Sequence, residues 1–125
     1  MGLGPDDLPD EGRLLRRIHP ELVKYDEGGS FRVTSAAFKD EKMSVDIGSY
    51  MPRHGLTWKH TLQGHPDHLL VSITAGTARE LQQSIEHCAI EDNPVHAQIE
   101  GHKTTKIARC FAKSASWIKG SCAVV

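Results

Sequence analysis

Residues 93–118, NPVHAQIEGHKTTKIARCFAKSASWI, decide how the rest of the chain is interpreted, because they join a strand pattern directly to a helix pattern. The residues at 95, 97 and 99 are apolar and alternate with polar ones, as in a half-buried strand. Gly101 ends this strand. From Thr105 onward, apolar residues recur at spacings of three and four as far as Ile118, which predicts a long amphipathic helix.

Four other segments have the pattern of strands. They are residues 13–19, 31–38, 43–47 and 68–75. The second of these strands has an alternative, which is a break at Ser35. Residues 48–66 have no periodicity and predict a long loop. Thr77 and Glu80 have the spacing of a capping box, which predicts a second helix that ends near His87.

These elements together predict an α+β fold. We expect a single domain with a mixed sheet of four or five strands and two helices packed on it. The domain is assigned to residues 13–119, a disordered acidic arm to residues 1–12, and a flexible tail to residues 120–125. The acidic arm has two interpretations: it lies on the basic C-terminal helix, or it is solvated.

The composition is that of one ordinary globular domain. Of 125 residues, 25% are charged and 38% are hydrophobic, and the net charge is −1. Three cysteines without a close pair favour a reducing, cytoplasmic location. No apolar run approaches the roughly 20 residues that span a bilayer, so no membrane partner is expected. No cofactor is expected either.

The turn before the predicted helix is the first candidate binding site. Gly101, His102, Lys103 and Thr104 stand where unpaired backbone N–H groups and the helix dipole favour an anion. The order Gly-x-Lys-Thr is similar to the end of a P-loop, but the first glycine of that motif is absent, which excludes a nucleoside triphosphatase. Two interpretations stay open. The turn contacts a phosphate or nucleic acid, or Thr104 or Thr105 merely caps the helix.

A basic stripe follows the turn. Lys106, Arg109 and Lys113 are spaced to share one face of the helix, where they could follow a phosphate backbone. Trp117 is the only aromatic residue close to them on this face, so no platform for base stacking is expected. A solvated helix face is the alternative.

Histidines gather in the predicted loop. His65, Asp67 and His68 offer three metal ligands in four residues, and His54 or His60 could complete a site. The alternative is a surface loop whose histidines titrate near neutral pH.

An enzymatic alternative rests on residue order alone. Arg17, Ser35 and Glu100 occur in the order used by ADP-ribosyltransferase-like folds, in which they would hold phosphates, shape the pocket and stabilise the transition state. His96 and Glu100 are four residues apart on one predicted strand, so they share a face and could form an acid/base pair. A solvent-facing polar row explains the same spacing.

Several segments carry a resemblance to other proteins. They are LRRIHP at 15–20, RVTSAAF at 32–38, MSVD at 43–46, TAGTAR at 74–79, NPVHA at 93–97 and GHKT at 101–104. The chain resembles a small, widespread group of uncharacterised bacterial proteins that have an R-I-x-P start, an S-S-A-A-F-like segment, an L-S-V-D-like segment, and N-P-A-H-A ahead of G-K-K-T. The chain departs from the group's pattern at Thr34, Val95 and His102. The resemblance implies a bacterial, cytoplasmic protein that acts with a partner, and it supplies no catalytic residues.

These observations favour a small intracellular binding protein over an enzyme. We expect an accessory component of a larger bacterial system that contacts a protein partner or a phosphate-bearing ligand through residues 101–105 and the basic helix. The alternative is a compact transferase or toxin that uses Arg17, Ser35, His96 and Glu100.

Overall fold

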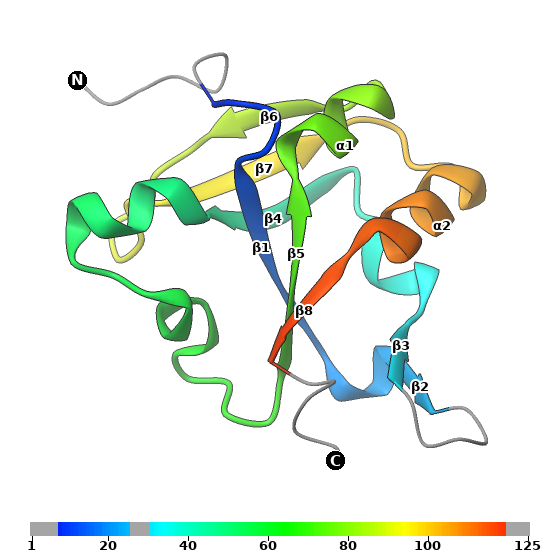
Figure 1. Cartoon of the computed structure of the whole chain (residues 1–125), viewed down its shortest axis with the longest axis horizontal. Helices are drawn as coiled ribbons and strands as arrows, with labels where there is room; N and C mark the ends of the chain where they lie inside the picture. Colours follow the sequence, from blue (N-terminus) through cyan, green and yellow to red (C-terminus); the bar gives the residue numbers. More distant parts are fainter. Residues whose placement is uncertain (1–7, 26–30, 120–125) are drawn as a thin grey trace.

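The computed structural model describes residues 8–25 and 31–119 (Figure 1). Within these residues, six strands form one sheet in the order β6-β7-β4-β1-β5-β8, and every neighbouring pair is antiparallel. The strands of this sheet are β1 (Arg13–Ile18), β4 (Lys42–Ile47), β5 (Leu69–Thr74), β6 (Ser84–His87), β7 (His96–Glu100) and β8 (Ser116–Lys119). The short strands β2 (Val23–Tyr25) and β3 (Phe31–Val33) form a separate antiparallel hairpin.

The helices lie on both sides of the large sheet. The α-helices are α1 (Ala75–Glu80) and α2 (Thr105–Ser114), and the 3-10 helices are η2 (Pro20–Leu22), η3 (Ser35–Phe38), η4 (Gly48–His54) and η5 (Trp58–Leu62). Figure 1 shows α1 and α2 on one side of the central strands and the segment of η4 and η5 on the other. The α+β class is therefore confirmed. The sheet is larger than the four or five strands expected, and its strand pairs are antiparallel where a mixed sheet was predicted.

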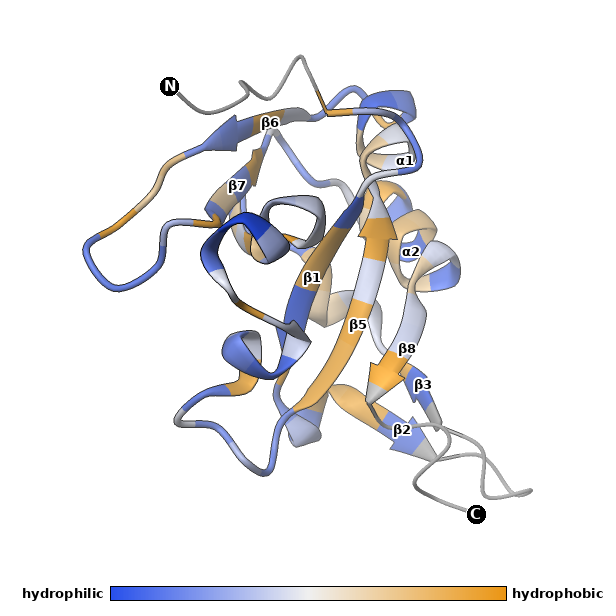
Figure 2. Cartoon of the chain, turned by 60° about the vertical axis from the view of Figure 1, so that its left-hand side comes forward, coloured by the Kyte–Doolittle hydropathy of each residue, from blue (hydrophilic) through white to orange (hydrophobic). Residues whose placement is uncertain are grey.

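The core lies between the sheet and the two α-helices. Hydrophobic residues follow most of β5 (Figure 2), and its four inner positions are buried. On α2, the buried positions are Ala108 and Phe111, one turn apart on the same face. Phe111 stacks on Phe38 of η3 with ring centroids 6.0 Å apart, and both rings are fully buried. This aromatic pair fixes α2 against the segment that follows the β2–β3 hairpin.

The long C-terminal helix predicted through Ile118 is wrong beyond Ser114. Ala115 has an extended backbone, with φ −69° and ψ 138°, and the chain continues as β8. Trp117 stands opposite Val71 of β5. The sequence SASWI has a weak helix propensity, and pairing with β5 supplies backbone hydrogen bonds that the helix pattern does not foresee.

The second predicted helix starts earlier and ends earlier than its sequence pattern indicates. Thr74 is the N-cap, and its Oγ1 accepts a hydrogen bond from the backbone N–H of Thr77 at 3.2 Å. The helix ends at Glu80, and Gln82 then adopts a left-handed φ of 60°. The chain reverses there and continues as strand β6, so Ile85 reaches the core from a strand.

The remaining local predictions have mixed outcomes. The strands expected in residues 13–19, 43–47, 68–75 and 95–99 are confirmed as β1, β4, β5 and β7. In residues 31–38 the alternative with a break at Ser35 is correct, because η3 starts there. The loop predicted over 48–66 contains the two 3-10 helices η4 and η5.

Residues 8–12 pack on α1, although they were expected to belong to a disordered arm. Leu8 is buried, with 2% of its surface exposed. The backbone N–H groups of Ala75 and Gly76 donate to the carbonyls of Gly12 and Asp10, both at 2.8 Å. The described part of the arm, residues 8–12, therefore contacts α1. Residues 1–7 and the predicted tail 120–125 lie outside the described residues.

None of the described helices is long and apolar enough to cross a membrane.

We expect Phe111→Ala to lower the free energy of unfolding by about 3–5 kcal/mol, because it removes a buried ring and leaves a cavity beside Phe38. Chemical denaturation monitored by circular dichroism measures this change. Lys106→Ala, on the exposed face of the same helix, should change stability by less than about 0.5 kcal/mol. Equal effects of the two substitutions would contradict the position of α2.

Candidate functional site

A groove rich in basic residues runs between α2 and the β2–β3 hairpin. Its volume is about 540 Å³, and its lining residues are Lys24, Arg32, Val33, Thr34, Ser35, Arg109, Ala112 and Lys113. Four of these side chains are cationic, and among the described residues no acidic side chain lines the groove. The groove therefore has the charge to attract an anion.

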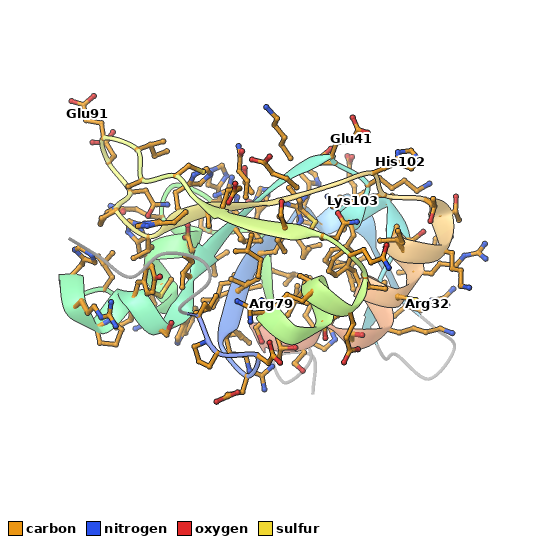
Figure 3. All side chains as sticks on the ribbon, turned by 90° about the horizontal axis from the view of Figure 1, so that it is seen from above. Arg32, Glu41, Arg79, Glu91, His102 and Lys103 are labelled. Atoms are coloured by element: carbon orange, nitrogen blue, oxygen red, sulfur yellow. The ribbon has the colours of Figure 1, made fainter. Side chains whose placement is uncertain are left out.

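The hairpin contributes two like charges that face each other. Lys24 and Arg32 are direct partners in the register of β2 and β3, so their side chains emerge side by side on one face of the hairpin. Like charges directly opposite one another are destabilising in an antiparallel pair. Figure 3 shows Arg32 on the side of the molecule where α2 lies. An anion bound between the hairpin and α2 would relieve this repulsion.

The helix contributes the other two charges. Thr104 caps α2, because its Oγ1 accepts a hydrogen bond from the N–H of Ile107 at 3.1 Å. With Phe111 turned to the core, Arg109 and Lys113 lie on the exposed side, one turn apart, and both line the groove. Lys106 is exposed but does not line the groove, so only two of the three residues in the predicted stripe meet there.

Lys103 has a structural position beneath the turn. Its side chain is 6% exposed, and Nζ donates to the carbonyl oxygens of Ile99 at 2.9 Å, Gly101 at 3.0 Å and Glu41 at 3.2 Å. Burial lowers the pKa of this ammonium group. This geometry disfavours the predicted contact of Lys103 with a partner or phosphate, because all three of its donors are directed at the backbone.

The rest of the Gly101–Thr105 turn is also occupied by local contacts. Gly101 has φ +148°, and a Cβ there would lie 2.5 Å from Oε1 of Gln83, so glycine is required for this close approach. Nδ1 of His102 lies 3.3 Å from a carboxylate oxygen of Glu41. Figure 3 shows Glu41, His102 and Lys103 gathered at one edge of the molecule. The helix-cap interpretation explains Thr104, and the acidic Glu41 disfavours an anion at this turn.

Only two of the four residues of the enzymatic alternative, Arg17 and His96, are brought together. Arg17 and His96 line a second cavity, of about 440 Å³, between β1, β4, η5 and the loop before β7. Ser35 lines the basic groove instead, and Glu100 lines neither. An arrangement of the ADP-ribosyltransferase type needs Arg17, Ser35 and Glu100 around one ligand, so this geometry disfavours that alternative.

The histidine cluster forms, but not as a metal site. The rings of His65 and His68 lie 4.8 Å apart, those of His19 and His68 lie 5.0 Å apart, and Nδ1 of His68 is 3.1 Å from Asp67. In the part of the chain that the structure describes, no group of three or more His, Cys, Asp or Glu side chains is arranged to hold a metal ion. The metal prediction for His65, Asp67 and His68 is therefore not supported, because the two imidazole rings contact each other edge to edge and the Asp67 carboxylate is hydrogen-bonded to His68.

Sequence reasoning missed two of the four groove cations. Lys24 and Arg32 flank the segment YDEGGS at 25–30, whose residue types are typical of a turn. Treating that turn as a hairpin would have placed both side chains on one face. Their proximity to α2 depends on packing between Phe38 and Phe111, which no local pattern shows.

Comparison with known proteins finds no matching family model, no matching curated protein and no matching solved structure. The resemblance to a bacterial group stays a prediction.

Lys103→Met should lower the free energy of unfolding by about 2–3 kcal/mol, because three backbone carbonyls lose a shared donor at a buried position. Thermal and urea unfolding measure the loss. Lys106→Met is the matched control on an exposed lysine of the adjoining helix and should be close to neutral. A stability equal to wild type in Lys103→Met would contradict the structural position of Lys103.

The pKa of His65 is lowered by desolvation and by the nearby charges of Arg17 and His68. Because the folded state then binds a proton less readily than the unfolded state, stability is fully present above the unfolded pKa of about 6.5 and is lost as the pH falls through the folded value. We expect His65→Gln to weaken this loss between pH 7.5 and pH 5. Urea unfolding across that range measures it, with the exposed His54→Gln as control. A pH dependence that His65→Gln leaves unchanged would contradict the expected shift.

Proposed function

We propose that this protein binds a phosphate-bearing ligand in the basic groove between α2 and the β2–β3 hairpin. The observation that carries the proposal is the convergence of four cationic side chains, from two distant segments, on one groove with no described acidic residue in its lining. Ion pairs with phosphate oxygens are strong where several cations act together. The protein is then a binding component, and it acts as an accessory part of a larger bacterial system in the cytoplasm.

The floor of the groove suggests what the ligand carries besides phosphate. Val33 and Ala112 are apolar, and Ser35 has a hydroxyl with no hydrogen-bond partner among the described residues. Thr34 is already occupied, because its hydroxyl donates to the carbonyl of Leu22 at 2.8 Å. An apolar surface beside Arg32 and Arg109 suits a flat base, because a guanidinium group can stack on the face of the base. A nucleotide, free or within a nucleic-acid strand, has this combination.

The basic helix therefore keeps the role expected from the sequence, with a different neighbour. Arg109 and Lys113 act with Lys24 and Arg32, and the Gly101–Thr105 turn supports α2 without taking part in binding. In this proposal the phosphate-bearing ligand, and not a protein, occupies the groove.

The double substitution Arg109→Glu and Lys113→Glu should weaken binding by at least about 100-fold, since it places two carboxylates opposite Lys24 and Arg32. Fluorescence anisotropy with a labelled single-stranded oligonucleotide, and calorimetry with a nucleoside diphosphate, test the two sources of phosphate. For the oligonucleotide, the slope of log affinity against log salt should approach about −3 in wild type, as four phosphate contacts require, and become shallower in the variant.

The matched control is the double substitution Lys39→Glu and Lys59→Glu, because it reverses two exposed lysines outside the groove and so changes the net charge by the same amount. Lys106→Glu shows whether the site extends along α2 beyond the groove. Equal affinity of wild type and the double variant for both probes, or no binding of either probe at low salt, would overturn the proposal.

A further inference from the structure

The second cavity holds a polar network that the basic groove does not involve. Its lining includes His60 and Thr61 of η5. Figure 1 shows the segment of η4 and η5 on the side of β1 away from α2. The cavity volume of about 440 Å³ falls within the range of small-ligand sites, about 300–1,000 Å³. Residues from β1, β4, η5 and the loop before β7 meet there, and three of these segments are among those that carry the sequence resemblance.

A buried carboxylate organises one wall of this cavity. Asp46 is 5% exposed, and its two oxygens accept hydrogen bonds from Oγ1 of Thr61 and Nδ2 of Asn93, both at 2.8 Å. Oδ1 of Asn93 accepts from the N–H of Val95 at 3.2 Å. A carboxylate can only accept and a backbone N–H can only donate, so the orientation of the Asn93 amide is fixed from both sides.

The fixed amide in turn fixes His60. Nε2 of His60 lies 3.0 Å from Oδ1 of Asn93. Because that oxygen only accepts, Nε2 carries the proton, and Nδ1 is the nitrogen left for a ligand. Asp46 therefore holds the amide of Asn93, and this amide orients the imidazole of His60.

A second imidazole is oriented independently. Nδ1 of His96 lies 3.0 Å from the carbonyl oxygen of Cys88, which can only accept, so Nδ1 carries the proton and Nε2 has the free lone pair. His96 is the register partner of Asp46 across β4 and β7, and its side chain emerges on the same face. Cys88 is not the nucleophile of this site, because burial and the charges of Glu100 and Glu86 raise the pKa of its thiol.

Arg17 supplies the cation. Its Nη1 donates to the carbonyl of Thr61 at 3.3 Å, and the rest of its guanidinium has no partner among the described residues. Arg16, by contrast, is occupied by the carbonyls of Ala37 and Ser44 and by Asp40. The cavity thus combines one free guanidinium edge with two imidazoles, each presenting one available nitrogen.

We propose that this cavity is a catalytic site that cleaves single-stranded RNA by transesterification. Nε2 of His96 takes the proton of a ribose 2′-hydroxyl, and the 2′-oxygen forms a bond to the adjacent phosphorus. The bond between phosphorus and the 5′-oxygen breaks, and that oxygen takes a proton from Nδ1 of the His60 imidazolium. Arg17 donates to the non-bridging oxygens. The products are a 2′,3′-cyclic phosphate and a 5′-hydroxyl.

RNA fits this set of groups because it carries its own nucleophile. One base, one acid and one cation complete the reaction, and no oxidant, reductant or second substrate is consumed. His96, His60 and Arg17 are the catalytic residues, whereas Asn93 and Asp46 are positioning residues that act through His60. The inference does not rest on ligand binding in the basic groove, which uses different residues from other elements.

The test is cleavage of a fluorophore-quencher RNA oligonucleotide by the full chain, in the presence of EDTA, with products identified by mass spectrometry. We expect His96→Gln and His60→Gln each to reduce the rate by at least about 100-fold, the effect of removing a general base or acid. An oligonucleotide with 2′-deoxyribose at the scissile position should not be cleaved. The exposed His54→Gln is the matched control and should cleave at the wild-type rate.

The positioning residues have a separate readout. Asn93→Ala should lower kcat per folded enzyme and leave KM unchanged, because Nε2 of His60 loses the acceptor that orients its ring towards the leaving oxygen. Circular dichroism checks folding, and Arg17→Gln, on an exposed side chain, provides the test if either histidine variant does not fold.

Three results would overturn the inference. They are no cleavage above the buffer rate, cleavage that both histidine substitutions leave unchanged, and products that carry a 5′-phosphate. The groove variant Arg109→Glu, Lys113→Glu separates this inference from the proposed function, because it should still cleave a dinucleotide substrate at the wild-type rate.

Discussion

The register of β4 against β7 is the constraint on which the rest of the structure depends. Met43 stands opposite Ile99 and Asp46 opposite His96, so apolar side chains fill the core face and polar ones the other. A slip of one residue would exchange the two faces. The ammonium group of Lys103 bonds the end of β7 to the residue before β4, and so fixes this register at its open end. Lys103, whose sequence context predicts an anion ligand, thus stabilises the pairing of β4 and β7.

Sequence patterns predicted the strands and the helix that are long enough to show a hydrophobic period. β1, β4, β5 and β7 are long enough to show alternation or a continuous apolar run, and α2 has a stripe and a capping threonine. The sequence was not informative for β6 and β8, which have four residues each and lie at the edges of the sheet. Their strand conformation comes from pairing with β7 and β5, and tertiary pairing overrides a weak local preference.

The candidate sites show the same division. Arg109 and Lys113 could be found because helical spacing alone places them together. Lys24 and Arg32 could not, since their approach to α2 depends on the packing of Phe38 against Phe111. Asp46, His60 and Asn93 come from three segments that only the fold unites. A local pattern does not show burial either. Burial makes Lys103 a donor to three backbone carbonyls, although its sequence context predicts an anion ligand.

The strand order also shapes how the chain must fold during synthesis. Of the described strands, β1 leaves the ribosome first, yet it lies between β4 and β5. Leu14 pairs with Ile47 on one side and Ile73 on the other, so both edges of β1 are paired only after β4 and β5 have been synthesised. Contacts of such long sequence separation make folding slow, and they leave an apolar strand with open edges in the nascent chain. Three of the six residues of β1 are arginines, at positions 13, 16 and 17. Their charge disfavours pairing of β1 with other chains before β4 and β5 are available.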